Sequence, residues 1–92
     1  MSHGWKMWIN IGWVEGELFS SVHLSEKGAL KSSIEDMLEV LHGGAQLPEG
    51  FKDPGDISAH DKETLNEIWI EMERYFHHTR YDFDIQHNLV RR

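Results

Sequence analysis

Apolar and polar residues alternate along the first part of the chain, with the period of two that is typical of a β-strand. One run lies between residues 5 and 13, and a second alternating run begins at Leu18. Glu15-Gly16 separates the two runs, and glycine tolerates the positive φ that a tight turn often needs. The pattern predicts a β-hairpin.

The hairpin register follows from a two-residue turn centred on Glu15-Gly16. It pairs Trp13 with Leu18, Ile11 with Ser20, Ile9 with Val22 and Met7 with Leu24. Every large apolar residue of these pairs then lies on one face, and a one-residue slip would scatter them. We expect this face to be buried. The opposite face, predicted to be the outer one, carries Trp8, Asn10, Phe19, Ser21 and His23.

Helical spacing replaces the alternation after Ser25, which is the expected N-cap of a first helix. Its predicted apolar stripe is Leu30, Ile34, Met37, Leu38 and Leu41. His42-Gly43-Gly44 ends the helix, and Gly43 suits a left-handed C-terminal cap.

A second helix is predicted after Ser58-Ala-His-Asp61, which has the outline of a capping box with aspartate in the acidic position. Its stripe is Leu65, Ile68, Trp69, Met72 and Phe76. Between the helices, residues 43–58 show no periodicity and form a loop longer than most helix connections. This loop is either functional or a plain crossover, and its Leu47 and Phe51 are candidates to cover Trp8 and Phe19.

The chain closes with a third strand pattern, which can flank either hairpin strand. Its two sets of alternating residues are Tyr81, Phe83, Ile85 and Leu89 against Asp82, Asp84, Gln86 and Asn88. The sequence therefore predicts an α+β fold of order β-β-α-α-β: a three-stranded, mainly antiparallel sheet with two helices packed on one face. One core should contain Met7, Ile9, Ile11, Trp13, Val22, Leu30, Ile34, Leu38, Leu65, Trp69, Met72, Phe83 and Ile85.

Composition limits the class of protein. The 92 residues, 39% of them hydrophobic, allow one domain spanning 1–92. No apolar run is long enough for a membrane span or a signal peptide, and cysteine is absent, so a cytoplasmic protein without disulfides or thiolate chemistry is expected. The net charge of −7 opposes direct nucleic-acid binding and favours a protein partner with a basic surface.

No residue pattern indicates catalysis or a cofactor. His77 and His78 are adjacent, so on a helix they diverge by about 100° and cannot easily share one metal ion, even with Glu73 nearby. Ser21 and His23 share a predicted face but lack a nucleophile elbow and an orienting acid. We therefore expect no enzyme activity, no metal and no cofactor.

Two surfaces are candidate partner-binding sites. Glu63, Glu67 and Glu71 recur every fourth residue of the second predicted helix, where neighbouring like charges repel one another. They form either a solvated face or a surface kept for a basic partner. The second candidate is the predicted outer face of the sheet, on which two aromatic residues stand among polar ones: Trp8 and Phe19, with Asp82 and Asp84 from the last strand.

The chain resembles the small acidic proteins of phages and mobile elements, among them anti-CRISPR and anti-restriction inhibitors. The resemblance rests on length, negative charge, the absence of catalytic motifs, the element order, and the segments Trp8-Ile9-Asn10-Ile11 to Leu18-Phe19 and Tyr81-Asp82-Phe83-Asp84-Ile85. It implies an inhibitor that binds the basic surface of a nuclease or of another nucleic-acid-handling complex. An immunity protein or antitoxin against a basic toxin fits the same features, and a small metal- or ligand-binding accessory protein is a third interpretation.

Overall fold

The computed structural model describes residues 4–14, 16–43, 49–76 and 81–91. The elements follow the predicted order: β1 (Gly4–Val14), β2 (Glu17–His23), α1 (Glu26–His42), α2 (Lys62–Arg74) and β3 (Asp82–Arg91). The α+β fold is confirmed. No helix in the described ranges is long and apolar enough to cross a membrane.

The three strands form one antiparallel sheet in the order β2-β1-β3. The last strand thus flanks β1, a choice that the sequence left open. The hairpin register is as predicted, with Trp13 opposite Leu18 and Ile9 opposite Val22. Gly16 has a φ of 84°, which supplies the left-handed conformation of the turn.

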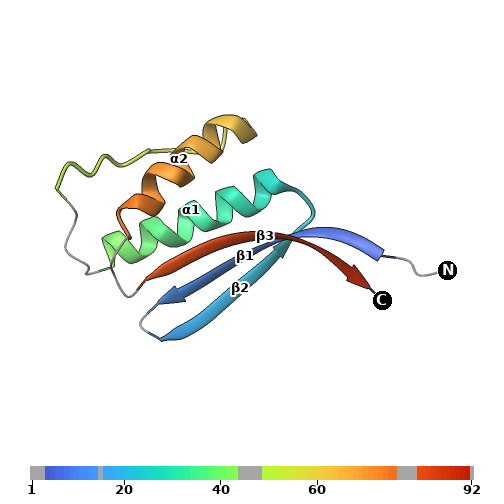
Figure 1. Ribbon diagram of the computed structural model, residues 1–92. Helices are drawn as coiled ribbons and strands as arrows, with labels where there is room; N and C mark the ends of the chain where they lie inside the picture. The colour runs from blue at the N-terminus through green and yellow to red at the C-terminus, as the bar shows by residue number, and fades with distance from the viewer. Residues whose placement is uncertain (1–3, 15, 44–48, 77–80, 92) are drawn as a thin grey trace.

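Both helices lie on the same side of the sheet (Figure 1). α1 lies directly against the strands, whereas α2 packs mainly on α1 and forms a further layer. Phe76, just after α2, reaches the sheet, with its ring centroid 4.8 Å from that of Phe83. The described part of the chain is therefore layered as sheet, α1 and α2.

The core fills the space between these layers as two adjoining clusters. One is built on the buried side chains of Met37, Leu41, Met72, Phe76 and Phe83. The other is built on Leu30, Ile34, Ile57 and Leu65, and Leu38, Ile68 and Trp69 pack against both. The predicted helix stripes are confirmed as core, and so are Phe83 and Ile85 of β3.

The prediction that the apolar face of the hairpin is buried is wrong. Trp13, Leu18 and Val22 are 45%, 57% and 56% exposed. The side chains that turn toward α1 are those of the other face, where Asn10 is fully buried and Phe19 packs against the first core cluster. Alternation sorts hairpin residues into two sets, but it does not say which set a helix will cover when both contain large apolar groups.

Two features on this inner face explain the choice. β3 pairs with β1 so that Phe83 and Ile85 stand opposite Gly12 and Asn10, on the helix side. Gly12 leaves room for the Phe19 ring, because a Cβ at this position would overlap the ring. Gly12 thus lets Phe19 lie over the central strand, with its ring centroid 6.1 Å from that of Phe83.

The helix caps agree with the predictions only in part. Ser25 caps α1 as expected, because its side chain accepts a hydrogen bond from the Gly28 backbone N–H. Gly43 has a φ of −83°, so the predicted left-handed cap is wrong. The capping box starting at Ser58 is also wrong: Asp61 is itself the N-cap of α2 and accepts from the Thr64 N–H, since the helix begins three residues later than the box requires.

Candidate functional site

The outer face of the sheet carries an apolar surface that nothing in the described chain covers. It comprises the outward side chains of the two hairpin strands: Met7, Ile9, Ile11 and Trp13 of β1, with Leu18 and Val22 of β2. We call this set the outer apolar face. The first three are half-buried by their neighbours, and Trp13, Leu18 and Val22 are exposed. Leu24, directly after β2, is 77% exposed and lies close by in sequence.

The strand geometry makes this surface continuous. Trp13 is paired with Leu18, and Ile9 with Val22, so these side chains project from the same side of neighbouring strands. Ser20 is the polar residue within the β2 row, opposite Ile11. Exposed apolar residues are ordinary when they are scattered, whereas a contiguous patch marks an interaction surface.

One border of the outer apolar face is acidic. Asp82 pairs with Trp13 and Asp84 with Ile11, so both carboxylates project on the outer side along β3. Both side chains are exposed. The side-chain nitrogen of Gln86 donates a hydrogen bond of 3.2 Å to the Asp84 carboxylate. This hydrogen bond does not neutralise the charge of Asp84. Among the described outward side chains of the sheet, Asp82 and Asp84 are the charged ones.

The two aromatic residues predicted for an outer binding patch lie elsewhere. Phe19 is half-buried and packs against the first core cluster, and Trp8 is half-buried on the inner face, stacked on His87 with ring centroids 4.0 Å apart. Each therefore has a burial site, contrary to the prediction that helix coverage would leave them without one. The structure does not bring them together with Asp82 and Asp84, which project from the opposite side of the sheet.

The acidic row of α2 is exposed, as its spacing predicted. Glu63, Glu67 and Glu71 all have exposed side chains. Arg74 Nη1 lies 3.8 Å from Glu71 Oε1, and both of these side chains are largely exposed to solvent. Such a pair contributes little to stability. This row lies on the helix layer away from the sheet, so one flat partner surface cannot cover it together with the outer apolar face (Figure 1).

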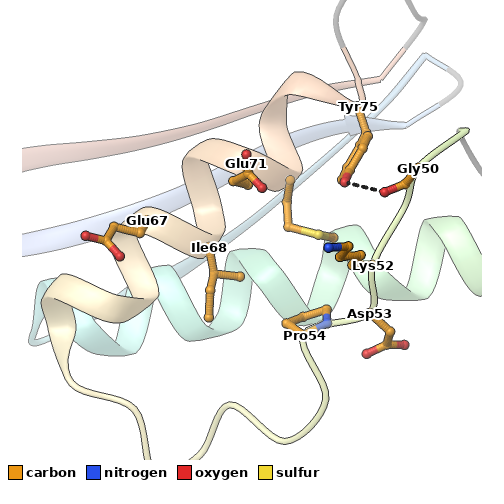
Figure 2. A pocket seen from close by; sticks show the side chains of 9 residues that line it. Gly50, Lys52, Asp53, Pro54, Glu67, Ile68, Glu71 and Tyr75 are labelled. Atoms are coloured by element: carbon orange, nitrogen blue, oxygen red, sulfur yellow. Dashed lines mark hydrogen bonds between the residues drawn. The ribbon is translucent and has the colours of Figure 1, made fainter.

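An open groove runs between α2 and the preceding segment (Figure 2). Its volume is about 520 Å³, with Glu67, Ile68, Glu71, Met72 and Tyr75 on the helix side and Gly50, Lys52, Asp53 and Pro54 on the other. The Asp53 carboxylate accepts from the Gly55 backbone N–H at 2.8 Å and is 2.9 Å from His42 Nε2. These contacts hold the pKa of Asp53 below its usual range and commit the carboxylate to shaping the loop.

Phe51, the described one of the two loop residues expected to cover Trp8, packs elsewhere. It makes an edge contact with Tyr75, with ring centroids 5.4 Å apart, and packs on the first core cluster. Leu47, the other residue predicted to fold back, lies outside the described residues. Residues 50–54 of the loop form one wall of the groove.

A polar cluster lies between the sheet and α1. Asn10 donates from Nδ2 to Asp36 Oδ2 at 2.9 Å, and Ser21 Oγ lies 2.8 Å from His23 Nε2 and 3.3 Å from Ser32 Oγ. Burial raises the pKa of the Asp36 carboxyl, an effect opposed by the Asn10 hydrogen bond. Asn10 Oδ1 is buried without a hydrogen-bond partner among the described groups.

This cluster is built as an internal contact of α1 with the sheet. The Ser21–His23 distance suits a nucleophile and its base, but no carboxylate among the described residues accepts a hydrogen bond from His23 to orient it. Ser21 is instead shared between His23, Ser32 and Asn10 on the helix-covered face. Within the described ranges no group of three His, Asp or Glu side chains is placed to hold a metal ion; His77 and His78 lie outside them.

Comparisons of this chain with protein-family models, with curated proteins and with solved structures found no match. The outer apolar face was missed in the sequence because its residues carry a core-like pattern. The signal that was available in the sequence is Gly12 in the opposite set, because a glycine inside a strand often marks the close approach of another group.

Proposed function

We propose that this chain is a non-enzymatic binding protein that docks a partner protein against the outer apolar face of its sheet. The observation that carries the proposal is the exposure of Trp13, Leu18 and Val22 on adjacent strands of a 92-residue domain. A chain this small has few large apolar side chains beyond those its core requires. Leaving several of them together in water favours a role in association.

Charge supports a partner with a basic surface. The protein has a net charge of −7, and Asp82 and Asp84 border the docking surface. A partner that offers apolar groups next to Lys or Arg complements both features. A nuclease or another nucleic-acid-handling complex has such a basic surface, which supports an inhibitor of the anti-CRISPR or anti-restriction type. An immunity protein against a basic toxin is the second candidate, and the identity of the captured partner separates the two.

The acidic row of α2 has a separate role in this proposal. Glu63, Glu67 and Glu71 lie on the layer farthest from the sheet, so they act through the long-range field rather than by contact at the docking surface. Their neutralisation should slow association at low salt and leave dissociation unchanged. At 0.15 M salt the effect should nearly vanish, because the Debye length is then about 8 Å.

The test is affinity capture from cells of the native host with three baits. They are the wild-type protein, an outer-face variant Leu18→Gln/Val22→Thr, and an α2 variant Glu63→Gln/Glu67→Gln/Glu71→Gln. The outer-face variant keeps the net charge and should lose the specific partner, whereas the α2 variant should retain it at physiological salt. Retention of the same partner by the outer-face variant, with its fold verified by thermal unfolding, refutes the proposal.

A further inference from the structure

We infer that the outer apolar face accepts an amphipathic α-helix of the partner, with Lys or Arg along the flank that meets Asp82 and Asp84. This inference rests on the proposed function and specifies the element that docks. The inner face of the same sheet already packs against a helix, since the 17-residue helix α1 lies directly on it. A partner helix on the other side would complete a three-layer α/β/α arrangement.

The dimensions of the outer apolar face fit one helix. The apolar rows occupy two adjacent strands, β1 and β2, which are paired over seven residues from Trp8 to Val14. Strands are about 4.8 Å apart and rise about 3.3 Å per residue, so two rows with their side chains span roughly 10 Å by 23 Å. A helix is about 10 Å wide and covers 23 Å with about 15 residues.

The charges on the third strand exclude a flat apolar partner. A second sheet packed face to face would cover β3 as well and bury Asp82 and Asp84 against apolar side chains. Burial of an unpaired carboxylate is costly. A helix seated over β1 and β2 leaves these two carboxylates at its edge, where cationic side chains can pair with them while they remain in water.

A second copy of this chain would also meet unfavourable charges at the outer apolar face. Two outer faces related by a two-fold axis place β3 either over the apolar β2 of the other copy or beside its acidic β3. The outer apolar face is also a poor match for α2 of a second copy. In that contact the acidic row of α2 would face Asp82 and Asp84, and the row consists of Glu63, Glu67 and Glu71. Like charges across an interface oppose association.

The experiment uses the full chain and three labelled peptides of about 16 residues. One peptide has leucines at helical i, i+3, i+4 and i+7 spacing with lysines on the remaining face. The second has glutamate in place of lysine. The third has the same residues as the first peptide in a different order, so that the leucines no longer share one helix face. Fluorescence anisotropy gives the Kd of each peptide for the wild-type protein at low and physiological salt.

Three protein variants locate the binding. Leu18→Gln/Val22→Thr removes apolar contact from the outer apolar face. Asp82→Asn/Asp84→Asn removes its charges, and Glu67→Gln/Glu71→Gln makes the same change in net charge on α2. The lysine peptide should bind best, at least tenfold more tightly than either control peptide. Its Kd should rise more than tenfold in the apolar variant and roughly 2- to 10-fold in the Asp82/Asp84 variant, but less than twofold in the α2 variant.

Equal binding of the lysine and glutamate peptides, or of the ordered and reordered lysine peptides, overturns the inference. So does an equal effect of the Asp82/Asp84 and α2 variants. If the wild-type protein is a dimer in analytical ultracentrifugation and the apolar variant is a monomer, the face binds a second copy instead, and the inference is overturned. If the captured partner is lost from the apolar variant while no peptide binds, the docking face stands and the helix is refuted. If that variant keeps the partner, the proposed function itself fails.

Discussion

On the hairpin strands of the sheet, the face with more large apolar side chains is the one that no helix covers, which is the reverse of the usual arrangement. The inner face of β1, which α1 covers, presents Trp8, Asn10 and Gly12, whereas the outer face presents Ile9, Ile11 and Trp13. The inner face gains its apolar character from its neighbours, since Phe19 and Phe83 lie on either side of Gly12. The more hydrophobic set of the hairpin is therefore the one in solvent.

The difference shows that covering a face requires shape as well as hydrophobicity. On the side that α1 covers, Gly12 leaves room above β1, and the Phe19 ring fills it and packs against the first core cluster. The bulky row of the other face is left for a partner whose surface can match it.

The largest expected effect is the difference in lost stability between a substitution on the inner face and one on the outer face. Phe83, on the inner face, is 4% exposed, and Phe83→Ala should cost about 3–5 kcal/mol because it opens a cavity in the core. Leu18→Ala, on the outer face, should cost less than about 1 kcal/mol, because 57% of Leu18 is already in water. Urea unfolding of both variants measures the difference. Equal losses would show that the outer face is part of the core.

A smaller effect tests the role of the glycine on the inner face. Gly12→Ala should destabilise the protein by about 1–3 kcal/mol, because the added methyl group overlaps the Phe19 ring. The double variant Gly12→Ala/Phe19→Leu should be more stable than the sum of the two single changes predicts, since the smaller side chain relieves the overlap. Urea unfolding of the four proteins gives the coupling. Additive losses would remove this explanation of the inner face.

The smallest effect concerns the polar cluster under α1. Burial raises the pKa of Asp36 in the folded protein, so the folded state binds a proton more readily than the unfolded chain. Asp36 therefore contributes a stability penalty at neutral pH, and this penalty disappears as pH falls through the raised folded pKa toward 3.8.

Asp36→Asn removes this titration. The free energy of unfolding of Asp36→Asn minus that of the wild type should therefore decrease between pH 7 and pH 3. Asp61→Asn is the matched control, because hydrogen bonds to Thr64 lower the pKa of Asp61, so that this carboxylate contributes stability above pH 3.8 that is lost on acidification. For Asp61→Asn the same difference should increase as pH falls. Parallel pH profiles for the two variants would contradict the raised pKa of Asp36.

The sequence by itself determined the elements and their order. Periods of two and of 3.6 residues located the strands and helices, Ser25 marked the first helix start, and the hairpin pairing from Trp13–Leu18 to Ile9–Val22 followed from the turn at Gly16. It also located the exposed acidic row from Glu63 to Glu71. These features depend on residues close together in the chain, so local patterns suffice to predict them.

The tertiary structure decided which side of the hairpin became the surface. That choice depends on β3 pairing with β1 and placing Phe83 opposite Gly12, a contact between residues about seventy positions apart. The strand period is the same whichever face is covered, so alternation cannot record the choice. Trp8 and Phe19 were therefore predicted on the outer side and lie on the inner one, while Trp13, Leu18 and Val22 form the surface now proposed for a partner.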